Sequence, residues 1–291
     1  MNRKHLLLIV SSLMIFSFAP IMKVASTNSE VEVILTGDIM LGRTVATTSL
    51  DKKSDPNYPF IKVNDRLRSA DVVFANLESP VATNCPRTYE GLIFCADPKM
   101  AEGLVYAGVD VVTLANNHIL NYGQKGLTET TKVLNENGIA YTGLGNLVIK
   151  EIKGTKFGFL GFEFIDKWPV QDDYDLVAKS DSKVDVLIVG VHWGAEYREN
   201  RSDKQNEIAK KLVFNGADVI AGHHPHWVQE VEHINGKPVY YSLGNFVFDQ
   251  MWSEKTREGL AIRLTFRDGK IVKEESLPVY IENWAQPAWV N

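Results

Sequence analysis

The sequence predicts a layered α/β protein in which mixed β-sheets, two of them packed together, are flanked by helices. Several apolar runs of four to six residues, rich in β-branched side chains, are typical of strands buried on both faces. Segments with helical periodicity separate several of these runs, and alternating strands and helices indicate an α/β fold. The chain has 291 residues, of which 45% are hydrophobic and 23% charged, as expected of a folded globular protein.

Six segments predict strands, and most share an acidic residue, an apolar run and a polar cluster. In chain order they are VEVILTGD (31–38), ADVVFANLES (70–79), VDVVTLANNH (109–118), VDVLIVGVHWG (184–194), ADVIAGHHPH (217–226) and KPVYYSLGNF (237–246). After Gly236 the pattern is mainly that of strands, at 239–248, 259–266 and 277–282, with a turn region at 273–276.

Three helices have recognisable ends. The first begins at Asp97 and Pro98, runs to Tyr106 and stops at Gly108, which suits a left-handed C-cap. The second spans 124–137 before Gly138, and the third spans 203–214 before Gly216. No linker interrupts residues 27–291, so we predict that they form one domain.

The first 26 residues resemble an export signal. Basic residues at 3–5 precede a nearly uncharged run at 6–22, and small residues at Val24 and Ser26 suit cleavage after Ser26. The run of about 17 residues is also at the short end of a membrane span, so an uncleaved anchor is the alternative. A buried core helix is a third interpretation, but the run is not amphipathic. Either of the first two places residues 27–291 outside the cytoplasm, in a membrane-anchored or secreted protein.

The two cysteines fit that location. Cys85 and Cys95 lie ten residues apart in a turn-rich stretch, and an oxidising compartment would let them form a disulfide. The alternative is two unpaired thiols. A metal site there is disfavoured, because no histidine or third cysteine is nearby.

The charge balance disfavours one class of partner. The chain has 31 basic and 36 acidic side chains, a formal net charge of −5. Binding to a phosphate backbone usually needs a basic face, so we expect no nucleic-acid partner.

The polar clusters predict a metal site. Five of the seven histidines lie in them, at positions 118, 192, 223, 224 and 226, together with Asp38, Glu78, Asn116 and Asn117. If the strands are parallel, the clusters meet at one sheet edge, where α/β proteins bind ligands. Carboxylate, amide and imidazole donors without a thiolate suit one or two divalent ions of Mn, Fe, Zn or Mg. A carboxylate bridging two ions is typical of a hydrolytic centre, and a nearby histidine can protonate the leaving oxygen.

Six motifs, spanning about residues 31–250, resemble those of the capsule-biosynthesis CapA family. They are GDIMLGR (37–43), NLESP (76–80), LANNH (114–118), HWGAEY (192–197), GHHPHWVQ (222–229) and YSLGNFVFDQ (241–250). The resemblance implies a part in making or exporting poly-γ-glutamate. It also implies a fold similar to the calcineurin-like metallophosphoesterases.

The resemblance implies roles for single residues. Asp38 corresponds to the opening metal aspartate, a catalytic position, and Glu78 to the bridging carboxylate. His118 corresponds to the general acid. The remaining implied metal ligands are Asn117, His192, His224 and His226.

Three departures from the family pattern affect the metal site. Met40 stands where a ligating histidine is usual, and Glu78 replaces an aspartate. The closing motif has one extra residue, so His223 is an alternative ligand to His224. A single ion held by Glu78, Asn117, His192 and one of these two histidines is therefore an alternative to two ions.

Five further residues are predicted to bind the substrate: Arg43, Asn76, Asn116, Glu196 and Asn245. Arg43 would hold an anionic group, although an ordinary surface arginine explains it equally well. Glu196 follows His192 closely, and Asn245 ends the sixth strand segment.

The leading functional hypothesis is an exported metal-dependent hydrolase acting on a phosphoester or an anionic polymer. The alternative is a non-hydrolytic component of a membrane polymer-synthesis or export complex, with a structural or polymer-binding metal. A plain binding protein with coincidental histidines is the third hypothesis.

Overall fold

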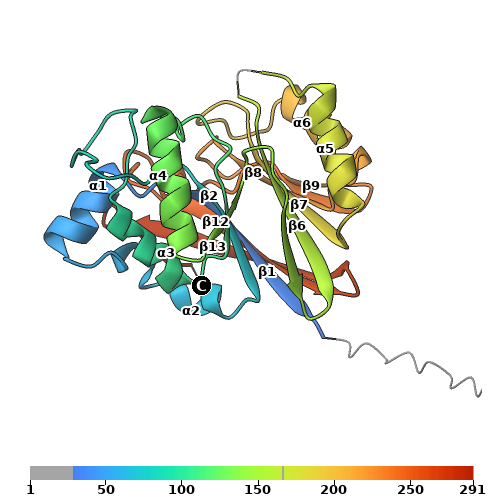
Figure 1. Cartoon of the computed structure of the whole chain (residues 1–291), viewed down its shortest axis with the longest axis horizontal. Coiled ribbons are helices and arrows are strands. Elements are labelled where there is room, and N and C mark those ends of the chain that lie inside the picture. The colour runs from blue at the N-terminus through green and yellow to red at the C-terminus, as the bar shows by residue number, and fades with distance from the viewer. Residues whose placement is uncertain (1–28, 166, 291) are drawn as a thin grey trace, which may run out of the picture.

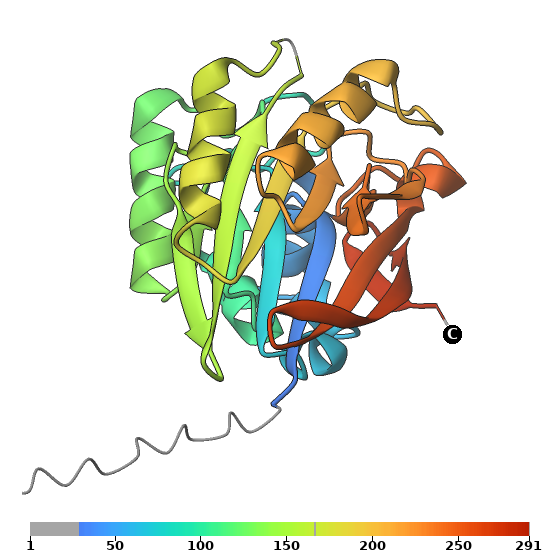
Figure 2. The same ribbon diagram turned by 90° about the vertical axis from the view of Figure 1, so that its right-hand side faces the viewer.

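Two mixed β-sheets pack face to face, and helices cover both outer faces (Figures 1 and 2). This computed structural model describes residues 29–165 and 167–290. The strand order of the first sheet is β14-β13-β12-β1-β2-β3-β4, with β11 also paired to β1, and that of the second is β5-β6-β7-β8-β10-β9. The predicted fold class is therefore confirmed.

The first sheet consists of β1 (Val31–Ile39), β2 (Val72–Leu77), β3 (Val111–Thr113), β4 (Ala140–Thr142), β11 (Asn245–Val247), β12 (Glu258–Arg267), β13 (Lys270–Glu282) and β14 (Gln286–Trp289). The second consists of β5 (Val148–Ile152), β6 (Thr155–Glu163), β7 (Val186–His192), β8 (Val219–His223), β9 (Val231–Ile234) and β10 (Lys237–Tyr240). The α-helices are α1 (Arg43–Ala46), α2 (Asn64–Arg68), α3 (Ala101–Ala107), α4 (Gly123–Glu136), α5 (Gln171–Asp181), α6 (Asp203–Phe214) and α7 (Glu254–Arg257).

Three buried apolar clusters hold the layers together. One lies between the first sheet and helices α1–α4, one between the two sheets, and one between the second sheet and helices α5 and α6. The sheets approach closely at Gly161 of β6, where a Cβ atom would lie 2.1 Å from Thr113 Oγ1 of β3. Only glycine allows this approach, which brings the ends of the two sheets together.

The aspartates that begin four of the predicted strands fix the register of the sheets. They are Asp71, Asp110, Asp185 and Asp218, whose carboxylates accept hydrogen bonds of 2.7–3.0 Å from the backbone N–H groups of Glu32, Val73, Lys156 and Leu187. Each aspartate also donates its own N–H to the carbonyl of the same neighbour, at 2.8–3.1 Å. This two-point contact, which we call the aspartate clamp, recurs in both sheets.

The three predicted helices are present, with small differences at their ends. Asp97 accepts from the amide of Lys99 and opens a 3₁₀ turn at Pro98–Met100, which leads into α3. Gly108 follows α3 in the left-handed conformation, with φ of 76°. The other two predicted helices correspond to α4 and α6.

Three predictions of local structure are wrong. The strand predicted at 239–248 is two strands in different sheets, β10 in the second and β11 in the first, because the chain turns between them at Gly244, which has φ of 65°. Residues 273–276 do not form a turn but lie within β13, and the chain reverses at Asp268 and Gly269, which have φ of 52° and 72°. Asp-Gly suits such a hairpin turn, whereas the polar run at 273–276 belongs to a largely solvent-exposed part of its strand. The polar clusters also meet at the adjoining edges of two sheets, not at one, because β1–β3 and β7–β8 belong to different sheets.

The predicted leader or anchor at residues 1–26 lies outside the described residues. Within 29–165 and 167–290, no helix has the length and apolar character needed to cross a membrane.

The structure contains a disulfide between Cys85 and Cys95, whose Cα atoms are 5.4 Å apart. It closes a loop on the way from β2 to α3. Three large apolar side chains in this loop are exposed, namely Tyr89, Leu92 and Ile93. The loop buries little apolar surface of its own, so the covalent link is a major constraint on its conformation.

Removing the disulfide should lower stability. For Cys85→Ser/Cys95→Ser we expect a loss of about 3 kcal/mol in the free energy of unfolding, because the unfolded chain regains the entropy of an open loop. Guanidinium unfolding measures this difference. A reducing agent should destabilise the wild-type protein similarly and leave the double variant unchanged; equal stability of both proteins would contradict the expectation.

Candidate metal centre

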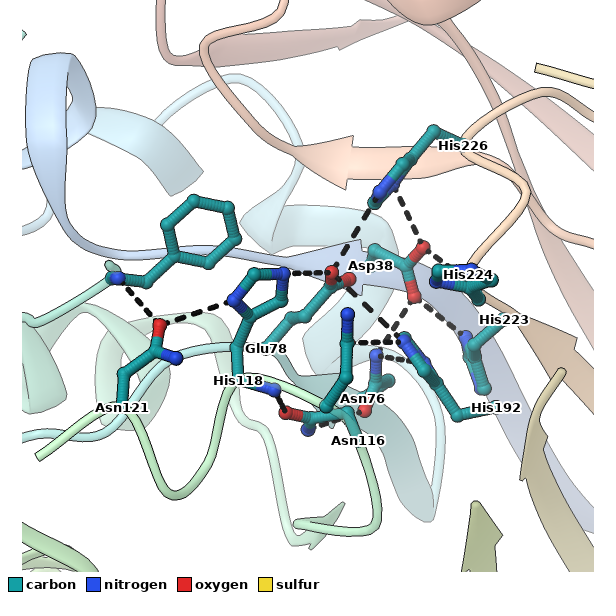
Figure 3. A network of polar contacts seen from close by, with 12 residues as sticks. Asp38, Asn76, Glu78, Asn116, His118, Asn121, His192, His223, His224 and His226 are labelled. Atoms are coloured by element: carbon teal, nitrogen blue, oxygen red, sulfur yellow. Dashed lines mark hydrogen bonds and ion pairs between the residues drawn. The ribbon is translucent and has the colours of Figure 1, made fainter. Parts of the chain in front are cut away.

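The polar clusters from both sheets meet in one buried site between the carboxyl ends of β1, β2, β3, β7 and β8 (Figure 3). Asp38 and Glu78 are fully buried, and the five clustered histidines are at most 7% exposed. The structure thus brings together side chains separated by up to 188 positions, from Asp38 to His226.

Asp38 is well supplied with hydrogen-bond donors. Its Oδ1 accepts from Asn76 Nδ2 at 2.8 Å, and its Oδ2 accepts from the backbone amide of His224 at 3.2 Å. Nδ1 of His223 and Nδ1 of His226 lie 3.1 and 3.3 Å from its two oxygens. Although burial alone would raise the pKa of Asp38, its contacts with these two histidines hold the pKa well below the usual value. Asp38 is therefore ionised.

Glu78 has the opposite environment. Neither of its carboxylate oxygens has a hydrogen-bond partner among the described residues. Burial, followed by the negative charges of Asp38 and Glu196, raises the pKa of Glu78 well above its usual value. A buried carboxylate without donors is costly, and such an atom calls for an explanation. A bound cation would supply the missing charge.

The spacing of the donor atoms fits such a cation. Ligand bonds of about 2.0–2.2 Å put two donors on one ion at most about 4.4 Å apart. Glu78 Oε1 lies 3.7, 3.8 and 4.0 Å from Nε2 of His226, His118 and His192. His192 Nε2 is 3.1 Å from Asn117 Oδ1. Possible ligand atoms of Asp38, Glu78 and His226 all lie within 4.8 Å of one another. The residues therefore fit a divalent ion bound by oxygen and nitrogen.

Asn245 orients His226 toward this space. The amide nitrogen of Asn245 donates to Gln250 Oε1 and to the carbonyl of Thr256, so its oxygen faces His226. His226 Nδ1 donates to that oxygen at 2.9 Å. The other ring nitrogen, Nε2, faces Glu78 Oε1 at 3.7 Å, and in metal sites such a hydrogen bond orients the ring of a ligating histidine.

His192 lies between two amides and is held neutral. Its Nδ1 is 3.3 Å from Asn76 Nδ2, and its Nε2 faces Asn117. Burial, followed by the neighbouring His224, lowers the pKa of His192 well below its usual value. Neutral imidazole is the form that binds metals.

Asn121 and Phe94, which were not predicted from the sequence, orient His118. Asn121 Oδ1 accepts from the backbone amide of Phe94 at 2.6 Å and lies 3.1 Å from His118 Nδ1, so Nδ1 is the donor and Nε2 points toward Glu78. The Phe94 ring stacks on His118 with ring centroids 3.8 Å apart. Burial lowers the pKa of His118. Asn121 follows His118 by three residues, which is the one sequence signal that could have indicated it.

Four of the five predicted substrate-binding residues are engaged within the protein. Asn76, Asn116 and Asn245 are buried and hydrogen-bonded to ligand candidates or to their backbone. The guanidinium of Arg43 forms an ion pair with Asp249 and donates to the carbonyl of Gly91, also contacting the Phe94 ring. Glu196 alone among the five is exposed.

The closing motif, which has one residue more than the family pattern, contains two residues with unusual backbone dihedral angles. His224 and His226 have φ of 94° and 58°, in the left-handed region that non-glycine residues seldom adopt. His223 ends β8 opposite His192. Both members of the His223/His224 pair reach the site, His223 through its ring beside Asp38 and His224 through its amide. Met40 gives no ligand, since it is buried in the helix-side core and its sulfur accepts from the amide of Gly42.

Comparisons with known proteins agree with these observations. The family described as bacterial capsule synthesis protein PGA_cap matches residues 32–250. The capsule biosynthesis protein CapA of Bacillus anthracis is 31% identical, over 88% of this chain and 68% of that protein. The PGA biosynthesis protein CapA of Bacillus subtilis (strain 168) is 28% identical, over 88% and 72%. A crystal structure of a hypothetical protein from Thermus thermophilus has a similar fold, with a TM-score of 0.58 and 17% identity over 87% of this chain and all of that one.

Substitution of Glu78 should separate stability from metal binding. For Glu78→Gln we expect the metal-free protein to gain on the order of 1 kcal/mol, because the variant replaces a carboxyl group that burial and Asp38 make costly to ionise, and to lose the stabilisation that added Mn²⁺ gives the wild type. Thermal unfolding with chelator and with Mn²⁺ measures both. Glu151→Gln, at an exposed position of β5, is the matched control and should change neither. A Glu78→Gln protein less stable than wild type in chelator would contradict the assignment.

Proposed function

The chain belongs to the PGA_cap family of bacterial capsule synthesis proteins, and from that premise we propose that it is an exported, metal-dependent hydrolase of capsule polymer synthesis or export. The fold is that of the calcineurin-like proteins, two packed sheets with the site at their adjoining edges. The polymer we propose is of the poly-γ-glutamate type, since the relative in Bacillus subtilis is named for PGA biosynthesis.

The observation that carries the proposal is the unsatisfied Glu78 carboxylate among nitrogen donors. A structural polar cluster would supply this carboxylate with hydrogen bonds, as it does for Asp38. Nε2 of His226 and Nε2 of His192 instead face Glu78 Oε1 at 3.7 and 4.0 Å, a spacing suited to an ion between them. The residues that would hold one or two ions are Asp38, Glu78, Asn117, His192, His226 and one of His223 and His224.

A divalent ion here would polarise a phosphoryl or carbonyl oxygen and acidify water. The protein's own residues orient the reaction. Asn76 and Asn116 hold the carboxylate of Asp38 and the backbone of His118 in place. Nε2 of His118, directed by Asn121 and Phe94, faces the site; when the ring also takes up a proton at Nε2, it can pass that proton to the leaving oxygen.

A hollow that shares Asn116 with the site is a candidate place for part of the substrate. It has a volume of about 380 Å³ and lies between α4 and the second sheet. Its lining includes Asn116 as well as Gln124, Glu163, Lys167 and Asp173. Amide and charged groups of both signs suit a polymer that carries carboxylates and backbone amides.

We also propose that the protein works outside the cytoplasm, attached to the membrane or secreted by its first 26 residues. The Cys85–Cys95 disulfide supports this location, because structural disulfides persist in oxidising compartments. β1 begins at Val31 and reaches the site at its other end with Asp38, so a membrane attachment before Val31 would lie at the opposite end of this strand from the site.

Met40 favours a second candidate function. Because it contributes no ligand, the site has one donor fewer than the family pattern, and a metal that serves structure or polymer binding in a synthesis complex needs no hydrolysis. The curated relatives from Mycobacterium tuberculosis are named as probable accessory proteins of polyglutamine synthesis. The same variant tests both candidates.

His118→Asn is that variant. We expect Mn²⁺-dependent hydrolysis of an aryl phosphate to fall by about 10²–10⁴-fold, the usual contribution of a proton donor, while bound metal measured by elemental analysis is retained. His233→Asn, which removes an exposed histidine paired with Glu274, is the matched control and should hydrolyse normally. If wild type does not hydrolyse such esters, and polymer output in cells survives His118→Asn but not His192→Ala, the accessory function replaces the hydrolase.

A further inference from the structure

Glu196 is held beside the closing motif although it lies on an exposed loop. The loop after β7 is tied to the turn after β8 by two backbone hydrogen bonds, from Trp193 to the carbonyl of His223 at 3.1 Å and from Tyr197 to the carbonyl of Pro225 at 2.8 Å. Tyr197 itself has φ of 57°, a conformation that changes the direction of the chain directly after Glu196. The position of Glu196 next to His224 and His226 is thus fixed by backbone.

These three side chains form a compact donor group. A carboxylate oxygen of Glu196 and ring nitrogens of His224 and His226 all lie within 4.8 Å of one another. Nδ1 of His224 is buried without a hydrogen-bond partner among the described residues, and the side chain is only 5% exposed. For His226, Asn245 engages Nδ1 and leaves Nε2 facing the site. Two imidazole nitrogens and one carboxylate oxygen are a ligand set for a divalent ion.

The surrounding charge also favours a cation. Asp38, Glu78 and Glu196 place three carboxyl groups beside the imidazoles of the site. The nearby guanidinium of Arg43 is already paired with Asp249, so it does not balance them. An ion coordinated by Glu196 would offset this negative charge.

We propose that Glu196 is a metal ligand, which together with His224 and His226 completes the cation site that Met40 leaves short of a donor. This inference rests on the proposed metal centre and extends it, because Glu196 comes from the loop after β7 and from none of the positions that the family resemblance assigns to ligands. As an exposed ligand at the mouth of the site, Glu196 also gives the ion an open side toward solvent and substrate.

The test is Mn²⁺ binding by the full chain, measured as free Mn²⁺ by electron paramagnetic resonance during titration and as bound metal by elemental analysis. We expect Glu196→Gln to lose one bound ion or to bind it at least about 10-fold more weakly, since even residues that only support ligands change metal affinity by about 10–100-fold. Glu199→Gln is the matched control: it removes the same charge from the same loop, where Glu199 pairs with Lys255, and should bind as wild type does.

Because Glu196 is exposed, the substitution should leave unfolding in chelator unchanged, and this measurement accompanies the titration. Glu196→Gln that binds Mn²⁺ with wild-type stoichiometry and affinity overturns the ligand role and leaves the proposed hydrolase standing. Loss of an ion in Glu196→Gln, with wild-type protein inactive on esters, supports the ligand role and counts against hydrolysis. A wild-type chain that binds no Mn²⁺ or Zn²⁺ overturns both.

Discussion

The burial of two carboxylates a few ångströms apart is the constraint around which this site is organised. Asp38 is compensated by an amide, a backbone N–H and two histidines, whereas Glu78 accepts no hydrogen bond within the described residues. Protein interiors do not tolerate an unpaired charge unless something outside the chain compensates it. Asn76, Asn121 and Asn245 orient His192, His118 and His226, so that a ring nitrogen of each faces Glu78. A cation in that space would explain why this carboxyl group is surrounded by nitrogens and yet accepts no hydrogen bond.

The aspartate clamps explain how strands from two sheets deliver their donors to the same place. In three strands the clamp and the donor are seven residues apart, as in Asp71 and Glu78, Asp110 and Asn117, and Asp185 and His192. The clamp fixes the strand against its neighbour at the far edge. β2 and β7 then extend about 20 Å and bring Glu78 and His192 to the near edge, whereas Asn117 lies in a turn four residues after the short strand β3. Gly161 lets the sheets touch just below the site. The acidic residue in the repeated sequence pattern therefore fixes the register of the strand and lies far from the proposed metal site.

Much of this could be predicted from sequence because it depends on local patterns. Buried runs predicted the central strands, and glycines such as Gly108 marked the helix ends. The convergence of two sheets could not be predicted, since apolar runs do not tell which sheet a strand joins. The hairpin of β5 and β6 and helix α5 were missed, because β5 alternates half-buried with exposed side chains and α5 is polar on most of its surface. From its position in the motif, Arg43 was predicted to bind a substrate anion. Its contact with Asp249 could not be predicted, because the two residues are 206 positions apart in the sequence.

The departures from the family pattern are coupled through the structure. Met40 withdraws a donor by packing into the helix-side core. In the closing motif His224 and His226 have left-handed conformations, and the carbonyl of Pro225 between them accepts the hydrogen bond that anchors the Glu196 loop. If His224 and His226 are the closing pair, the additional residue is His223, whose ring lies beside Asp38. The donor missing on β1 is then accompanied by an additional imidazole at the end of β8 and, under the proposed ligand role, by a carboxylate from the loop after β7.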